Sequence, residues 1–220
     1  MGKSLKKIVS SIRGPVLALA PTDDSRLEPE MVEDMVLDVR ATLITEFFNS
    51  RYYLEDAFFQ IYNGLNIESE KLTIAPGIQE DFPEIFCEIP ELHSAVGFKN
   101  IRYFGSTDGR HNFERTSIAG FISSDGKLFT MNEPVYTINS NRVLIKNLPS
   151  LGMTKGRMIA VWYDPRQVPG YDEDKSFPVS DSMIHKLELI CKKNLMSTLG
   201  IPPDRLNDAQ DVVINTKANE

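Results

Sequence analysis

The period of the hydrophobic pattern changes once along this chain, and that change restricts the fold more than any other feature. Between residues 29 and 50, apolar side chains such as Met31, Met35 and Val39 recur at helical spacing. From residue 58 to residue 163, apolar residues fall instead into short runs separated by turn signals. This succession predicts an α+β fold, in which a long helix over 29–50 precedes a central antiparallel β-domain over 58–163.

Short runs rich in β-branched and aromatic residues predict the individual strands of this β-domain. They lie at residues 71–75, 85–89, 100–104, 117–122, 127–131, 135–138, 142–146 and 158–163. Between them, Asp108-Gly109, Asp125-Gly126 and Asn139 to Asn141 are typical turn sequences. Because short turns join antiparallel neighbours, we expect hairpins rather than parallel βαβ units.

The last quarter of the chain predicts a loop, a second long helix and a polar tail. Ser180 or Asp181 can cap a helix over 181–199, and Gly200 supplies a left-handed stop. The tail over 201–220 is too polar to form a core. We therefore expect an N-terminal arm over 1–28, a single core domain over 29–200, and this extended tail.

The first fourteen residues leave two alternatives open. Leu5, Ile8, Val9 and Ile12 have helical spacing and are surrounded by basic residues. Such a segment can be an arm that docks on a partner; otherwise it is a frayed terminus or a helix that packs on its own domain.

Composition narrows the class of protein. The chain has 220 residues, of which 41% are apolar, which suffices for one good core and could just stretch to two small ones. Its net charge of −7 lacks the basic footprint of a DNA reader. Cys87 and Cys191 form neither a disulfide framework nor a zinc pattern. No apolar run is long enough to span a bilayer or to act as a signal peptide, so we expect synthesis in the cytoplasm and no membrane partner.

Sequence motifs give no support to an enzyme. The three histidines stand far apart, and neither a phosphate-binding glycine loop nor a nucleophile elbow is present. A metal-dependent nuclease could gather Asp56, Glu68 and Asp108 in space, and a receptor-binding or carbohydrate-binding module could use the β-domain. We favour neither alternative, and we expect no catalytic residue, no cofactor and no metal.

Two features favour contacts with other proteins. The aromatic end of the first helix, including Tyr52 and Tyr53, predicts core or subunit interface rather than a base-stacking platform, because no cluster of Lys or Arg is interleaved with it. The acidic run Asp172, Glu173 and Asp174 is typical of a solvated loop, and it can also meet a basic partner.

Four segments taken in order carry a resemblance to a known family. They are Arg40-Ala41-Thr42-Leu43-Ile44, Ile89-Pro90, Trp162-Tyr163-Asp164-Pro165 and Pro202-Pro203-Asp204-Arg205-Leu206-Asn207-Asp208. Together they span about residues 29 to 210, and their order and spacing resemble the ring, or neck, proteins of crAss-like tailed bacteriophages.

The resemblance implies a non-enzymatic virion structural protein of the head-to-tail connector. Copies would form a cyclic ring, twelvefold, at the portal vertex between the portal and neighbouring ring or tail proteins, with genome DNA passing through the channel without sequence-specific binding. Synthesis would take place in the cytoplasm of the bacterial host. The contact residues expected on this view are Lys6, Lys7, Arg13, Tyr52, Tyr53, Asp172, Glu173, Asp174, Asp204, Arg205, Asn207 and Asp208.

Overall fold

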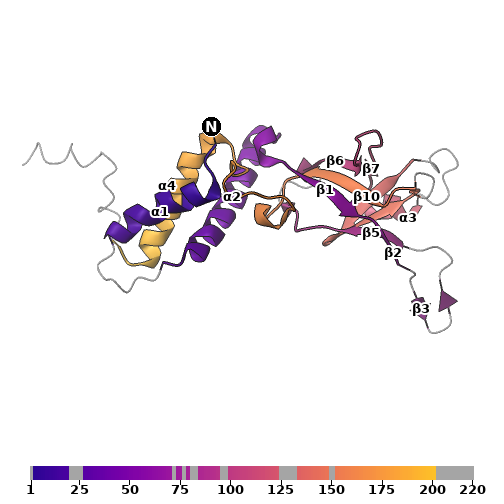
Figure 1. Cartoon of the computed structure of the whole chain (residues 1–220), viewed down its shortest axis with the longest axis horizontal. Coiled ribbons are helices and arrows are strands. Elements are labelled where there is room, and N and C mark those ends of the chain that lie inside the picture. Colours follow the sequence, from indigo (N-terminus) through magenta and orange to yellow (C-terminus); the bar gives the residue numbers. More distant parts are fainter. Residues whose placement is uncertain are drawn as a thin grey trace, which may run out of the picture. The chain divides into compact units, whose positions relative to one another are not determined.

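The computed structural model divides the chain into two compact units. The helical unit comprises residues 1–43 and 173–220, and the β unit comprises residues 44–172 (Figure 1). The structure describes residues 2–19, 27–70, 73–75, 78–79, 84–94, 99–123, 133–148 and 152–201. Whether residues 29–200 fold as one domain stays a prediction.

Three long helices carry the helical unit (Figure 1). They are α1 (Leu5–Leu19), α2 (Pro29–Arg51), which continues into the β unit after residue 43, and α4 (Asp181–Thr198). The helical periods predicted α2 and α4 to within one residue at each end. Ser180 precedes α4 in an extended conformation, and Gly200 follows it with φ of 66°.

The N-terminal segment packs within its own unit, which is the second of the two alternatives left by its sequence. Helix α1 lies against α4, and its apolar face is buried. The helix runs through Gly14 and Pro15 and buries Val16 as well. The buried side chains are Leu5, Ile8, Val9, Ile12 and Val16.

Two charged side chains are buried among these helices. The fully buried Arg40 donates from Nε to the carbonyl oxygen of Pro178 at 2.9 Å, and its guanidinium lies 5.7 Å from the centroid of the Phe177 ring. Glu188 on α4 accepts hydrogen bonds from Lys3 Nζ at 2.6 Å and from Ser11 Oγ at 2.7 Å. Both buried charges therefore have hydrogen-bond partners within the helical unit itself.

The β unit contains two sheets and a separate hairpin. The order is β1-β10-β6 in the three-stranded sheet, β2-β5-β9-β8-β7 in the five-stranded sheet, and β3-β4 in the hairpin. The strands are β1 (Gln60–Asn66), β2 (Glu68–Glu70), β3 (Thr73–Ala75), β4 (Ile78–Gln79), β5 (Glu84–Glu88), β6 (Ile101–Ser106), β7 (Glu114–Arg115), β8 (Val135–Asn139), β9 (Arg142–Lys146) and β10 (Lys155–Ala160).

The chain passes directly from one sheet to the other at two places. β1 pairs with β10, whereas β2, which follows it after one residue, pairs with β5. At the other end, Phe113 donates to the Phe104 carbonyl at 2.8 Å, and β7 directly after it pairs with β8. Between the sheets lies a core that is rich in aromatic side chains, including Phe104, Phe113, Tyr136 and Trp162.

Most expected strands are present, but one prediction was wrong. Residues 117–122 were expected to be a strand, and residues 118–123 form the short helix α3 (Ile118–Ser123). Ser117 Oγ accepts a hydrogen bond from the backbone N–H of Gly120 at 3.1 Å, which caps the helix and outweighs the β-propensity of its isoleucines. The expected strand at 127–131 lies outside the described residues, and the β7–β8 pair is parallel.

Candidate interaction surfaces

An aromatic surface lies where α2 ends and the β unit begins. Its rings come from the last turn of α2, from the residues just after it and from the residue that follows the 3-10 helix Asp56–Phe58. We call this surface the aromatic patch. It consists of Phe47, Phe48, Tyr52, Tyr53 and Phe59, together with Arg51, Lys99 and Arg102.

Edge-to-face contacts order these rings. The Phe47 centroid lies 5.6 Å from that of Tyr53 and 5.4 Å from that of Phe58, which is fully buried. Phe48 contacts Tyr52 at 6.5 Å. Because such pairs add stability beyond area burial and Phe58 anchors Phe47 and Tyr53 to the interior, this part of the patch is preorganised rather than loose.

Cations cover several of the rings. Arg51 lies 5.0 Å from the Phe47 centroid, Lys99 lies 5.3 Å from that of Phe48, and Arg102 lies 4.1 Å from that of Phe59. Sequence reasoning found no cluster of Lys or Arg interleaved with the aromatic segment, which contains Arg51, yet folding brings Lys99 and Arg102 from about 45 residues away. Spacing along the chain carried no signal for this arrangement.

Carboxylates also belong to the surroundings of the patch. Asp56 pairs with Arg102 at 2.6 Å, and Glu55 lies close enough to Arg51 to contribute to its electrostatic environment. Lys99 donates to the backbone carbonyl of Tyr52 at 2.8 Å. The patch is therefore aromatic and mixed in charge, rather than a purely basic surface.

Tyr52 stands in an unusual backbone conformation. It follows the last residue of α2 with φ of 59°, and its N–H donates to the Phe48 carbonyl at 2.7 Å. Glycine or asparagine is usual at this position, because a Cβ atom makes the left-handed region unfavourable. Nevertheless, 72% of Tyr52 is exposed, as is 49% of Tyr53.

The outer face of the five-stranded sheet is acidic at the β2–β5 edge. Strand alternation places Glu68 and Glu70 of β2 on the same face as Glu84 and Glu88 of β5, away from the buried Cys87. Glu70 stands directly opposite Glu84, a like-charge pair that is unfavourable by itself. Arg142 offsets part of this charge, at 3.8 Å from Glu70 and 3.4 Å from Glu88.

Helix α3 adds apolar side chains to the same outer face. Lys146 of β9 follows the core-facing Ile145, and its Nζ lies 4.6 Å from the centroid of Phe121 on α3. Ile118 and Ile122 of α3 are 56% and 67% exposed. We call the outer face with these two isoleucines and the four glutamates the acidic face.

The predicted basic and acidic contact residues meet within the helical unit. Lys6 Nζ lies 2.9 Å from Glu173 and 3.8 Å from Asp174. Lys7 is exposed and Arg13 is half-buried on the same helix. Asp172 is half-buried at the boundary of the β unit, whereas Asp204, Arg205, Asn207 and Asp208 lie outside the described residues.

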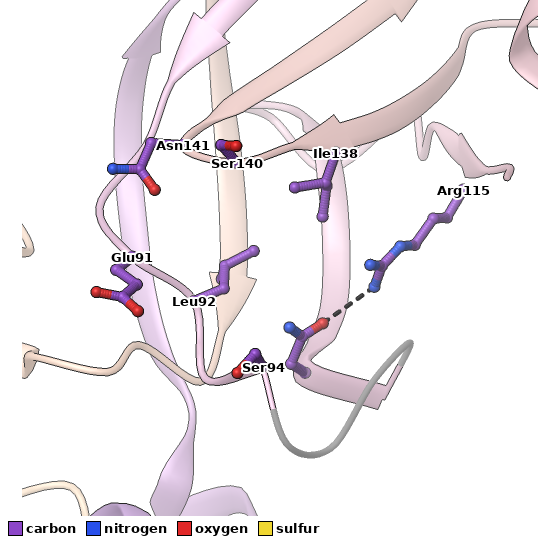
Figure 2. Close-up of a pocket in the computed structure, with 8 residues that line it drawn as sticks. Glu91, Leu92, Ser94, Arg115, Ile138, Ser140 and Asn141 are labelled. Atoms are coloured by element: carbon purple, nitrogen blue, oxygen red, sulfur yellow. Dashed lines mark hydrogen bonds between the residues drawn. The ribbon is translucent and has the colours of Figure 1, made fainter. Parts of the chain in front are cut away.

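A small pocket of about 360 Å³ opens beside the turn between β8 and β9 (Figure 2). Arg115 points into it and donates from Nη1 to Asn100 Oδ1 at 3.0 Å. Burial lowers the pKa of Arg115. Among the described residues, those that line this pocket are polar, charged or aliphatic. The lining residues are Glu91, Leu92, Ser94, Asn100, Arg115, Ile138, Ser140 and Asn141.

The carboxylates proposed for a metal site do not come together. Within the described residues, no three His, Cys, Asp or Glu side chains form a group that could hold a metal ion. Asp56 binds Arg102, and Asp108 accepts bonds from Ser106 Oγ and from the Arg110 N–H, which lower its pKa. In the part of the chain that the structure describes, no helix has the length and hydropathy of a membrane span.

Comparison with known proteins identifies the family. The sequence matches the family of phage tail ring protein 2 over residues 7–213, which is most of the chain. No curated protein matches it. A chain with the α+β architecture and the surfaces described above thus matches a family of structural ring proteins. This chain therefore belongs to the phage tail ring protein 2 family of crAss-like phages.

Proposed function

We propose that this chain forms a cyclic, twelvefold ring in the head-to-tail connector, between the portal and the tail, around the channel through which the genome leaves. The observation that carries the proposal is the match to a tail ring family over residues 7–213. Its role is mechanical and non-enzymatic: the subunits contact one another and neighbouring rings, and DNA passes without being read.

Ring closure sets a requirement on the surface of each subunit. A closed ring with rotational symmetry higher than two uses heterologous contacts, in which one surface binds a different surface on the next copy. The aromatic patch and the acidic face are two such different surfaces, and both belong to the β unit. Their presence supports self-assembly through this unit.

The helical unit supplies the proposed contacts to other components of the connector. Lys6, Lys7 and Arg13 lie on α1, and Lys6 pairs with Glu173 and Asp174 of the acidic loop. Deleting residues 1–13 would remove buried Leu5 and Ile12, so it would test folding rather than assembly. Replacing both Lys6 and Lys7 with Glu keeps this core and is expected to weaken binding to the portal or to an adjacent ring.

Acidity suits a conduit for DNA. Carboxylates on a channel wall repel the phosphate backbone and reduce contacts that would slow the passage of the genome. The net charge of −7 supports this part of the proposal. A ring whose lumen is lined by Lys and Arg, with the carboxylates outside, would contradict it.

Mass photometry of the purified full chain over a range of concentrations tests the proposal directly. We expect monomers at low concentration and a discrete species of twelve copies at high concentration, with annular particles in negative-stain micrographs. A chain that stays monomeric at every concentration would refute self-assembly into a ring.

A further inference from the structure

We propose that the aromatic patch of one copy docks on the acidic face of the next copy, and that this contact closes the ring. The inference rests on the proposed ring function and names the two surfaces that perform it. The occupant of the patch is thus a second copy of this chain.

The conformation of Tyr52 is the first argument for a partner at the patch. A bulky residue in the left-handed region is strained, and such strain concentrates at functional positions. The fold gains little in return, since 72% of Tyr52 is exposed and its ring meets the Phe48 ring edge to face at a centroid distance of 6.5 Å. A neighbouring subunit that covers the ring would supply the missing contact.

The composition of the patch is the second argument. Tyrosine and arginine are enriched among the residues that dominate binding energy in protein interfaces, and the patch holds two of each. Phe47 holds the Tyr53 ring against the buried Phe58, so little entropy is lost when Tyr53 binds. Preorganised aromatic side chains with charged groups around them are typical of a protein-binding surface.

The acidic face offers complementary chemistry. The carboxylates of Glu70 and Glu84 stand opposite each other, and a cation from another subunit would relieve their repulsion. The exposed Ile118 and Ile122 provide apolar contacts for the tyrosine rings. Lys99 and Arg102 can approach the carboxylates while the rings cover the isoleucines.

The positions of the two surfaces suit a head-to-tail contact. The patch lies just before Gln60, and the acidic face begins at Glu68, at the far end of the segment that forms β1 and β2. At about 3.3 Å per extended residue, residues 60–70 span at most roughly 33 Å, and the bulge at Gly64 shortens this distance. Two complementary surfaces on opposite ends of one unit bind a neighbour in a heterologous manner and not by two-fold symmetry.

Single-stranded nucleic acid is the competing occupant of an exposed aromatic surface. Such binding requires a positive groove that follows the phosphate backbone. Here Asp56 and Glu55 stand among the cations, and the whole chain carries a net charge of −7. The charge of the surface therefore favours a protein partner over a polyanion.

Cross-linking between two variants, each of which carries one added exposed cysteine, tests the contact. Ser50→Cys places a thiol at the rim of the patch, and Ala119→Cys places one on α3; both original residues are exposed. Cys87 and Cys191 are buried, so they react slowly. With a short bismaleimide, we expect dimers when the two variants are mixed, none with either alone, and a ladder up to the closed ring with the double variant.

Two outcomes of this experiment overturn the inference while leaving the ring proposal intact. The first is annular particles without cross-links in the mixture. The second is self-cross-linking of Ser50→Cys alone, which would show a symmetric contact. By contrast, the absence of any oligomer for the wild-type chain would refute the ring itself.

A pair of matched substitutions separates binding from folding. Tyr52→Asn suits the left-handed backbone and removes the ring, so we expect at least a tenfold loss in the concentration-dependent assembly with no fall in melting temperature. Met31→Asn, at an exposed apolar residue outside both surfaces, should assemble normally. Normal assembly of Tyr52→Asn, or Tyr52-dependent binding of a labelled single-stranded oligonucleotide in fluorescence anisotropy, would contradict the inference.

Discussion

The helical unit and the β unit use charged and aromatic side chains in opposite ways. In the helical unit, Arg40 and Glu188 are buried, and each binds groups of the same unit. In the β unit, Arg102 and Tyr52 stand at the surface around an ordered cluster of rings. The first arrangement stabilises the fold, and the second leaves binding capacity for a neighbour. Polar and aromatic groups therefore indicate function here only when their burial is known.

Replacing one arginine in each unit should give the largest contrast. Arg40→Ala leaves the Pro178 carbonyl without its donor and opens a cavity beside Phe177, so we expect the free energy of unfolding to fall by about 3 kcal/mol. Arg142→Ala removes a half-exposed side chain from Phe86 and two glutamates, and should cost less than about 1 kcal/mol. Urea unfolding followed by circular dichroism measures both.

The rate of thiol labelling shows which unit a substitution destabilises, because each unit contains one buried cysteine. Burial raises the pKa of Cys191 in the helical unit and of Cys87 in the β unit to about 12, so both need opening of the fold to react. Arg40→Ala should speed the labelling of Cys191 more than that of Cys87. Equal acceleration of both would show that the two units unfold together.

Lowering the pH should destabilise the helical unit more than the β unit. Burial raises the pKa of Glu188, but the hydrogen bonds from Lys3 and Ser11 outweigh it, and the net pKa is lowered. The stability from these bonds is complete above the unfolded pKa of about 4.3 and is lost as the pH falls through the lower folded value.

Glu188→Gln should therefore cost about 1 kcal/mol of unfolding free energy at pH 7, and the difference from wild type should shrink towards pH 3. The matched variant is Glu88→Gln in the β unit, whose side chain is 68% exposed. It should change the unfolding free energy by less than about 0.5 kcal/mol at either pH. A deficit of Glu188→Gln that stays constant with pH would contradict the role assigned to its charge.

The smallest expected change in unfolding free energy is an increase, and not a decrease as in the variants above. Because Tyr52 is strained at φ of 59°, Tyr52→Asn should raise the unfolding free energy by up to about 1 kcal/mol. Tyr53→Ser, at the next residue with ordinary backbone, loses the edge-to-face contact with Phe47 and should lower it by about 1 kcal/mol. Thermal unfolding at a concentration where the chain is monomeric compares them; a clear destabilisation by Tyr52→Asn would argue that the ring serves the fold.

The local sequence pattern was sufficient to predict the long helices α2 and α4. The stripe of α2 and the glycine stop of α4 are local signals that agree with the structure, whereas Ser180 precedes α4 without a side-chain capping hydrogen bond. The strands around the Asn139–Asn141 turn, β8 and β9, were predicted for the same reason. Helix α3 was missed because β-branched residues favour a strand, while a single Ser117 cap decides the local structure.

The sequence alone predicted some residues of the candidate surfaces and missed others. Tyr52 and Tyr53 could be named, because consecutive aromatic residues after a helix stand out. Lys99 and Arg102 could not, since tertiary folding alone brings them over Phe48 and Phe59. Likewise, Lys6 and Glu173 were separate predictions, and only the fold shows that they pair.

Determination of the assembled ring by cryo-electron microscopy is the most direct test of the central claim, that the chain closes into a ring through its β unit. We predict that Tyr52, 72% exposed in the single chain, is covered by the neighbour's β2–β5 edge and α3 in every copy. A ring in which Tyr52 remains in solvent, or in which only the helical units touch, would contradict it.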